Sequence, residues 1–165
     1  MQTMNGKFEA VIDELNQELT DVYGNDTKLF KRLTEVQKDL GLLYGERATC
    51  PFLRPHFLTR TQYNSIAHAA ETVAEAMTRL TEAALQDDQL LSRLDLDDIE
   101  QKLVRVDPKY RVISNSSRFD TFISGENFKF LEYNAETPAG VGDQTQLEIV
   151  LEQIPLIKEF LSANA

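Results

Sequence analysis

A long helical stripe in the middle of the chain most constrains what this sequence can fold into. Apolar residues recur every three or four positions without a slip, which is the period of one helix face. The stripe is made of Tyr63, Ile66, Ala70, Val73, Met77, Leu80 and Ala84. The intervening alanines favour a helix and permit close neighbours. We therefore predict a helix that begins at Thr59 or Thr61, with this stripe as its packing face and His68 exposed.

Two further amphipathic helices are predicted before it. The first spans about residues 6–23 and stops at Gly24, and the second runs to about Tyr44 with Asp26 or Thr27 as its cap. Because so few residues connect them, we expect the two helices to pack antiparallel. Their apolar positions are Phe8, Ile12, Leu15, Leu19 and Val22, then Leu29, Leu33, Val36, Leu40 and Leu43.

Residues 45–59 break this helical pattern with a glycine and two prolines, so we predict a loop. The loop carries Cys50, the single cysteine, which we interpret as structural and which fits a reducing compartment. It also carries His56, which we interpret as a buried or interfacial histidine rather than a catalytic base. The spacing of His56 and His68 is not that of metal ligands.

Shorter helices and strands are predicted in the later part of the chain. Aspartates that suit helix capping begin two short helices, at residues 87–88 and at residues 97–98, and residues 112–113 are expected to form a brief strand. Residues 136–142 are predicted to form a glycine-containing loop. Asp143 is then expected to cap a last helix that Pro155 kinks or splits.

The whole chain fits one mainly α domain, of the α+β kind, over residues 1–165. Within it we predict a helical part over residues 1–110, a β-hairpin and loop over residues 111–140, and a C-terminal helix over residues 141–165. The expected architecture is a helical cluster with a small antiparallel hairpin or sheet near residues 112–134.

The composition and net charge of the chain limit the kinds of molecule that it is expected to bind. Seventeen basic side chains against 27 acidic ones give a net charge of −10, which argues against nucleic acid and anionic membranes as partners. A nucleotide stays compatible with this charge, because Mg²⁺ brings its own positive charge. No apolar run approaches the ~20 residues of a membrane span, and the acidic N-terminal stretch does not resemble a secretory signal. We therefore expect a cytoplasmic protein.

Residues 117–140 hold the residues with the clearest chemical signal. Two short apolar runs flank turn-forming residues 124–127, which predicts a hairpin. Alternation places Arg118 and Asp120 on one face of the first strand and Glu132 and Asn134 on one face of the second. A two-residue turn would put these pairs on opposite faces, whereas a three-residue turn would oppose Asp120 to Glu132 and Arg118 to Asn134. We favour the three-residue turn, with Asn127 in the left-handed region.

Two opposed carboxylates repel each other, so this register requires a compensating charge. Mg²⁺ supplies one, because it takes carboxylate and amide oxygens together with substrate phosphates. Arg118 beside such a metal could hold a phosphoryl oxygen. The alternative interpretation is an exposed hairpin face that carries solvated charges.

The pattern R-x-D, eleven residues, then E-Y-N-A-E-T-P resembles the magnesium and triphosphate segment of glutathionylspermidine synthase-like enzymes, in the circularly permuted ATP-grasp superfamily. The resemblance implies that Arg118 assists the transferred phosphate and that Asp120, Glu132 and Asn134 hold Mg²⁺. Glu136 stands where the family often has aspartate.

The resemblance implies the N-terminal part of an ATP- and Mg²⁺-dependent carboxylate–amine ligase that works through an acyl phosphate. Its cofactors would be Mg²⁺ and ATP, and its partners a small carboxylate and an amine. The nucleotide-binding lobes of that family follow the metal segment, so we expect this chain to need them in cis or in trans and to be inactive alone. The alternative function is a small non-catalytic helical interaction module with a structural hairpin.

Overall fold

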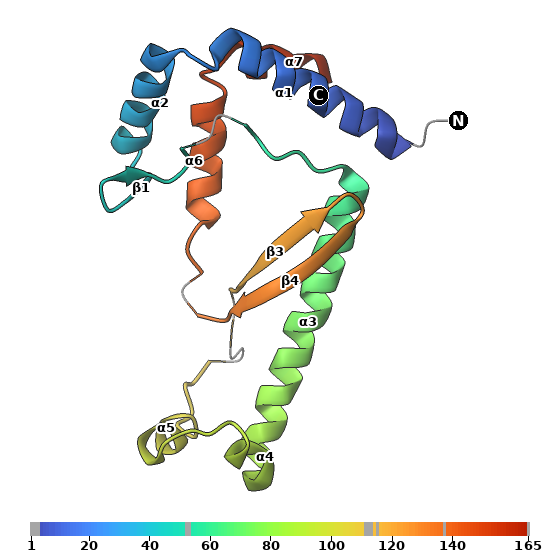
Figure 1. Ribbon diagram of the computed structural model, residues 1–165. Helices are drawn as coiled ribbons and strands as arrows, with labels where there is room; N and C mark the ends of the chain where they lie inside the picture. Colours follow the sequence, from blue (N-terminus) through green and yellow to red (C-terminus); the bar gives the residue numbers. More distant parts are fainter. Residues whose placement is uncertain (1–3, 52–53, 111–113, 115, 137, 165) are drawn as a thin grey trace. The chain divides into compact units, whose positions relative to one another are not determined.

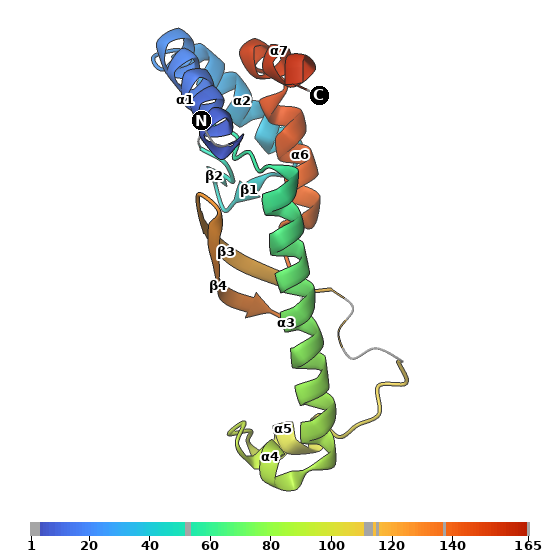
Figure 2. The same ribbon diagram turned by 90° about the vertical axis from the view of Figure 1, so that its right-hand side faces the viewer.

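The computed structural model in Figure 1 and Figure 2 describes residues 4–51, 54–110, 114, 116–136 and 138–164. This part of the chain contains seven helices and two small antiparallel sheets of two strands each, which confirms the mainly α fold with a small hairpin. The chain divides into two compact units. Unit 1 consists of residues 1–59 and 139–165, and unit 2 of residues 60–138.

Unit 1 combines segments from both ends of the chain. Its elements are α1 (Met4–Tyr23), α2 (Thr27–Asp39), β1 (Leu43–Tyr44), β2 (Arg47–Ala48), α6 (Val141–Leu151) and α7 (Pro155–Asn164). One apolar cluster holds them together, and its buried members are Leu15, Leu19, Leu29, Leu33, Leu42, Val150, Ile154 and Ile157. The Arg32 side chain also donates a hydrogen bond to the backbone oxygen of Gln153. The apolar positions predicted for α1 and α2 therefore supply half of these buried residues, namely Leu15, Leu19, Leu29 and Leu33.

Helix α2 begins as predicted but ends earlier. The Asp26 side chain caps it by accepting from the backbone N–H groups of Lys28 and Leu29. The prediction that the helix continues to about Tyr44 is wrong, because Gly41 adopts a φ of +74° and the Leu42 N–H bonds back to the Gln37 oxygen. This glycine closes the helix as left-handed residues commonly do. The chain then forms the β1–β2 hairpin in a region predicted to be helix end and loop.

Gln37 is a buried polar residue that joins α2 to the following loop. Its side-chain amide donates to the Cys50 oxygen at 3.0 Å and accepts from the Cys50 N–H at 2.9 Å. Only 3% of Gln37 is exposed. Both polar atoms of this buried side chain are thus satisfied by the backbone of one residue, as burial requires.

The turn between α1 and α2 has room for glycine alone. A Cβ added at Gly24 would overlap the backbone oxygen of Thr20, which accepts the Gly24 N–H. We expect Gly24→Ala to lower the free energy of unfolding by about 1–3 kcal/mol, because a backbone atom cannot step aside as a flexible side chain can. Urea unfolding followed by circular dichroism measures this change. Gly142→Ala is the matched control: nothing lies within 4 Å of its Cβ position, so we expect no loss and up to about 1 kcal/mol of gain.

The C-terminal helix is split at Pro155, as predicted, into α6 and α7. The prediction that Asp143 caps α6 is wrong. Gly140, with a φ of +102°, occupies the N-cap position, so that Asp143 lies in the first helical turn. Gly142 accordingly belongs to the helix rather than to the preceding loop.

Unit 2 is built around α3 (Arg60–Gln86), the predicted long helix. It is followed by α4 (Asp88–Ser92), α5 (Asp98–Leu103), β3 (Arg118–Ser124) and β4 (Asn127–Asn134). Asp87 caps α4, and Asp97 forms a capping box with Glu100 at the start of α5, as the aspartate positions predict. The strand predicted at residues 112–113 lies outside the described residues.

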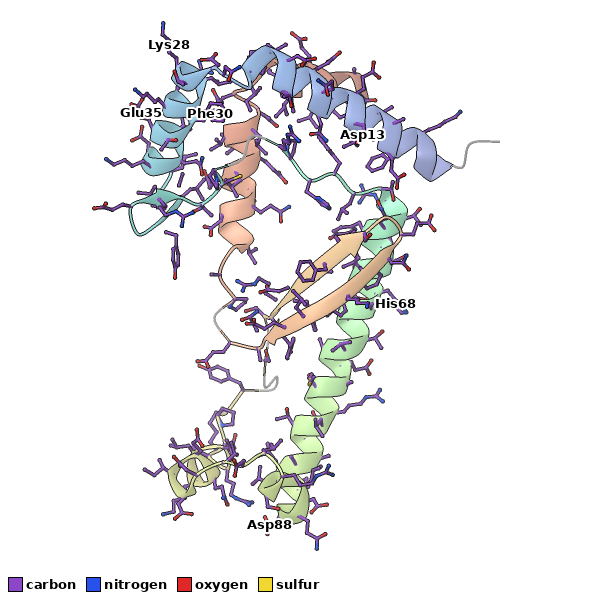
Figure 3. All side chains as sticks on the ribbon, viewed as in Figure 1. Asp13, Lys28, Phe30, Glu35, His68 and Asp88 are labelled. Atoms are coloured by element: carbon purple, nitrogen blue, oxygen red, sulfur yellow. The ribbon has the colours of Figure 1, made fainter. Side chains whose placement is uncertain are left out.

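The apolar stripe of α3 is only partly a packing face. Ala84 is buried, whereas Tyr63, Met77 and Leu80 are 55%, 39% and 46% exposed. The prediction that the whole stripe is packed is therefore wrong within the part of unit 2 that the structure describes. The short helix α4 and a two-stranded hairpin are too small to cover a helix of 27 residues. His68 lies off the stripe and is exposed, as predicted (Figure 3).

None of the helices in the described ranges combines the length and apolar character needed to cross a membrane.

Candidate functional site

The hairpin of β3 and β4 carries all four predicted site residues. In both views it lies alongside α3 (Figure 1 and Figure 2). The Gln62 side chain of α3 donates to the Gly125 oxygen at the turn over 2.8 Å. At the open end, the Ser114 hydroxyl donates to the Ala135 oxygen over 3.1 Å. The hairpin is thus anchored within unit 2 at both ends, although the sequence pattern did not point to Gln62 or Ser114.

The turn differs from its prediction. Ser124 pairs with Asn127, so the loop contains two residues, Gly125 and Glu126, rather than three. Gly125 adopts a φ of +58°. Two-residue hairpin turns require such a conformation at their first central position, and glycine adopts it without strain. Gly125 therefore takes the left-handed role that the prediction gave to Asn127.

The predicted pairing of the four polar residues is nevertheless confirmed. Asp120 lies opposite Glu132, and Arg118 lies opposite Asn134. The register shifts between Asp120 and Thr121, because Thr121 pairs with Phe130 and leaves Leu131 as an extra residue in β4. This β-bulge restores the pairing that a two-residue turn alone would have removed. Directly opposed residues of this kind have Cβ atoms about 4.5–5.5 Å apart.

The bulge also separates the two faces of the hairpin. On one face, Phe119 lies 4.6 Å from Phe130 and 4.7 Å from Tyr133 between ring centroids, and Phe128 lies 5.6 Å from Phe130. The opposite face carries the four polar residues. The aromatic positions 128 and 130 are even and position 133 is odd, so the alternation changes phase around Leu131. This phase change is the sequence signal that could have located the bulge.

Arg118 and Asp120 form an ion pair on the polar face. The Arg118 Nε donates to the Asp120 Oδ1 over 2.8 Å, and each side chain is 40% exposed. A pair this exposed contributes only about 0–1 kcal/mol, so its partners exchange readily. Among the described residues, no side-chain hydrogen bond reaches the Asp120 Oδ2. Asp120 can therefore offer an oxygen to a cation while its other oxygen holds Arg118.

Asn134 shows an unusual hydrogen-bonding state. Its Nδ2 is buried and has no acceptor among the described residues. A buried donor without an acceptor costs about 1–3 kcal/mol and calls for an explanation. An asparagine side chain carries both an oxygen that accepts and an NH2 group that donates. Asn134 could thus supply an amide oxygen to a metal or a donor to a phosphate oxygen.

The donor set of the polar face fits a hard divalent cation. Asp120 and Glu132 supply carboxylates and Asn134 an amide oxygen, which are ligand types that Mg²⁺ takes. No group of three or more His, Cys, Asp or Glu side chains that could hold a metal occurs in the described ranges. Since the candidate set has only two carboxylates, phosphate oxygens or water would have to complete the coordination.

Other residues singled out from the sequence lie apart from this set. His56, predicted to be buried or interfacial, belongs to unit 1 and is exposed, so the buried alternative is wrong. Cys50 also belongs to unit 1, where it has the structural contact with Gln37 described above. In the remainder of the E-Y-N-A-E-T-P motif, Glu136 is exposed and Thr137 lies outside the described residues.

Comparisons with protein-family models, with curated proteins and with solved structures find no match for this chain.

Proposed function

We propose that this chain is the N-terminal part of an ATP- and Mg²⁺-dependent carboxylate–amine ligase similar to glutathionylspermidine synthase. In this proposal, Asp120, Glu132 and Asn134 hold Mg²⁺ and Arg118 contacts the transferred phosphoryl group. One observation carries the proposal: the bulge at Leu131 keeps all four residues on one face, with the two carboxylates directly opposed. Arg118 offsets one of these two charges through its ion pair with Asp120, and a divalent cation would compensate the charge that remains on the opposed pair.

The residues divide the work of phosphoryl transfer by their charge. When bound, Mg²⁺ neutralises charge on the phosphates and orients them. Arg118 provides a guanidinium that is always charged and can form two parallel hydrogen bonds to a phosphoryl group. Because both side chains of the Arg118–Asp120 pair are 40% exposed, this pair would oppose such a contact by no more than about 1 kcal/mol. With its amide oxygen on Mg²⁺, Asn134 would still have its Nδ2, which lacks an acceptor within the described part of the chain, to donate to a phosphate oxygen.

Metal binding by the hairpin is the direct test. We expect added Mg²⁺ with ATP to shift the backbone amide resonances of β3 and β4 saturably. Glu132→Gln should weaken this response at least tenfold, because one of two carboxylate ligands is lost. Nuclear magnetic resonance titration of the whole chain measures both effects.

Glu126→Gln is the matched control for this titration. Glu126 is an exposed carboxylate in the turn of the same hairpin, away from the opposed pair. Its removal changes the net charge equally and should leave the Mg²⁺ response intact. If both variants lose the response to the same extent, the cation only screens surface charge and the proposal fails.

In this proposal, the chain takes part in catalysis only when nucleotide-binding lobes are present, either in the same polypeptide or in a partner. The enzyme would act in the cytoplasm. Two measurements test the need for the lobes: ATP turnover by this chain together with a co-purifying partner, and ATP turnover by a longer protein that contains this chain. Turnover should then depend on Arg118. If the hairpin shows no saturable Mg²⁺ response even in such a complex, a non-catalytic interaction module is favoured instead.

A further inference from the structure

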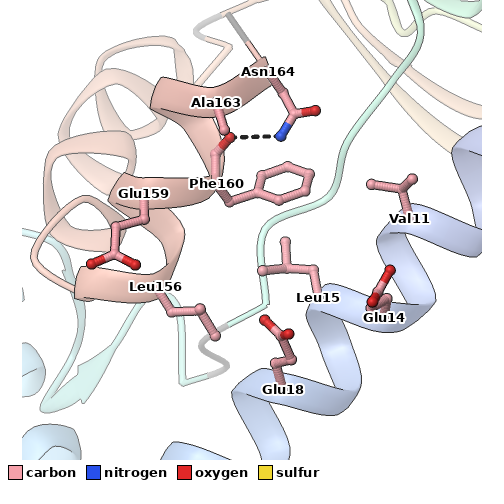
Figure 4. A pocket seen from close by; sticks show the side chains of 9 residues that line it. All are labelled: Val11, Glu14, Leu15, Glu18, Leu156, Glu159, Phe160, Ala163 and Asn164. Carbon is pink, nitrogen blue, oxygen red and sulfur yellow. Dashed lines mark hydrogen bonds between the residues drawn. The ribbon is translucent and has the colours of Figure 1, made fainter.

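Unit 1 has an open trough along α1 that the proposed function does not use. One pocket of about 350 Å³ lies between α1 and α7 (Figure 4). A second, of about 550 Å³, extends it toward the start of α1. Val11, Phe160 and Asn164 line both pockets, so the two are parts of one depression. On α1 the trough extends from Lys7 to Glu18, which corresponds to about 16 Å of helix.

The floor of the trough is apolar and is spaced for contact with a helix. In Figure 4, Val11 and Leu15 of α1 face Phe160 of α7 across the pocket. In the pocket between α1 and α7, the lining residues of α7 recur every three or four positions: Leu156, Glu159, Phe160, Ala163 and Asn164. The second pocket adds Leu161. Val11 is 41% exposed. Phe57 and Leu58 of the preceding loop line the second pocket, with the Phe57 ring 5.3 Å from that of Phe160. The part between α1 and α7 forms a groove of the kind that a third amphipathic helix can fill.

The rim of the pocket between α1 and α7 is acidic. Glu14 and Glu18 of α1 and Glu159 of α7 line it, all three are exposed, and its described lining contains no lysine or arginine. A partner therefore needs positive charge beside its apolar stripe. A second copy of this chain lacks that complementarity, because glutamates would meet glutamates and each chain carries a net charge of −10.

We infer that the trough between α1 and α7 binds a basic amphipathic helix of a partner protein. Apolar side chains of the partner, at spacings of three and four, would contact Val11, Leu156 and Phe160. Lysines or arginines on either side of that stripe would contact Glu14, Glu18 and Glu159. The charges chiefly set the orientation and the association rate, while the apolar floor supplies the affinity.

A synthetic helical peptide tests this inference. The probe has 14 residues, with leucines at positions i, i+3, i+4, i+7 and onward and lysines elsewhere. The reference peptide has glutamates in place of the lysines. We expect the lysine peptide to bind the whole chain one to one and to shift amide resonances of residues 11–18 and 156–163. Its affinity should fall as salt is added, and the glutamate peptide should bind at least tenfold more weakly.

Three variants distinguish the trough from general attraction to an acidic protein. Glu14→Lys with Glu18→Lys should weaken binding at least tenfold. Glu71→Lys with Glu82→Lys, an equal charge change at exposed positions of α3, should leave affinity within about threefold. Val11→Asp should weaken binding at least tenfold without loss of helical circular dichroism, because Val11 is partly exposed.

The inference is overturned by any of three outcomes. Equal weakening by the two charge-reversal pairs would mean non-specific attraction. Unchanged binding by Val11→Asp would mean that the apolar floor is not contacted. Self-association that Val11→Asp abolishes, seen by sedimentation at rising protein concentration, would make a second copy the occupant. None of these variants alters Arg118, Asp120, Glu132 or Asn134, so the Mg²⁺ titration tests the proposed function separately.

Discussion

Replacing Ile154 by alanine should lower the free energy of unfolding of unit 1 by about 2–5 kcal/mol. Ile154 has no exposed surface and belongs to the apolar cluster that joins α1 and α2 to α6 and α7. Its removal deletes buried methyl groups and leaves a cavity that the surrounding helices can close only in part. Urea unfolding monitored by resonances of unit 1 measures the change.

Ile149→Ala is the matched control, since it deletes the same atoms from α6 at a position that is 45% exposed. We expect this variant to lose less than about 1 kcal/mol, because nearly half of the Ile149 surface already contacts water. Equal losses for the two variants would contradict the assignment of Ile154 to the centre of the core.

Replacing Gln37 by glutamate should make stability depend on pH. At pH 7 the introduced carboxylate cannot donate to the Cys50 oxygen and is buried beside it, so we expect a loss of about 1–3 kcal/mol. Protonation restores the donor. The pKa of this carboxyl is therefore raised in the folded state above its unfolded value near 4.3. The loss should be smallest below about pH 4 and should grow as the pH rises through that value.

Thermal and urea unfolding at several pH values, always compared with the unmodified protein, measure this dependence. Gln86→Glu is the control, because Gln86 is exposed at the end of α3 and should titrate without a comparable change. If Gln37→Glu is as stable at pH 7 as at pH 4, the paired hydrogen bonds to Cys50 do not contribute as described.

The helices were predictable because local chemistry decides where they begin. Asp26, Asp87 and Asp97 each accept hydrogen bonds from backbone N–H groups two and three residues ahead, and such capping is visible as an aspartate before an apolar run. Helix ends were harder to predict. The second helix has apolar residues as far as Leu43, but the left-handed conformation of Gly41 ends it at Asp39. Apolar spacing alone does not report a change in backbone conformation.

The hairpin shows how the pairing of strand residues can be predicted correctly although the turn length is predicted wrongly. Asp120 and Glu132 pair whether the extra residue lies in the turn or in the strand, since both arrangements add one residue between them. The structure places it at Leu131, which is 60% exposed. The contacts among the aromatic rings distinguish the two arrangements, because only a bulge keeps Phe128 and Phe130 on the same face as Tyr133.

The exposure of the α3 stripe was beyond sequence reasoning. Periodicity identifies which side of a helix is apolar, and it predicts a packing face only on the assumption that a neighbour covers it. Tyr63, Met77 and Leu80 fulfil the spacing and yet remain exposed in the described part of unit 2. A neighbour that lies far away in the sequence leaves no mark on the local pattern.

The division of unit 1 between two distant segments affects how the protein is made. Leu15, Leu19, Leu29, Leu33 and Leu42 leave the ribosome long before their core partners Val150, Ile154 and Ile157. At ~5–20 residues per second, the roughly one hundred intervening residues take on the order of 5–20 s to synthesise. During that interval the apolar faces of α1 and α2 lack the α6 and α7 side of their core, whereas all of unit 2 has been translated before α6 begins. Newly made chains therefore pass through a period in which one half is open to chaperones and to aggregation.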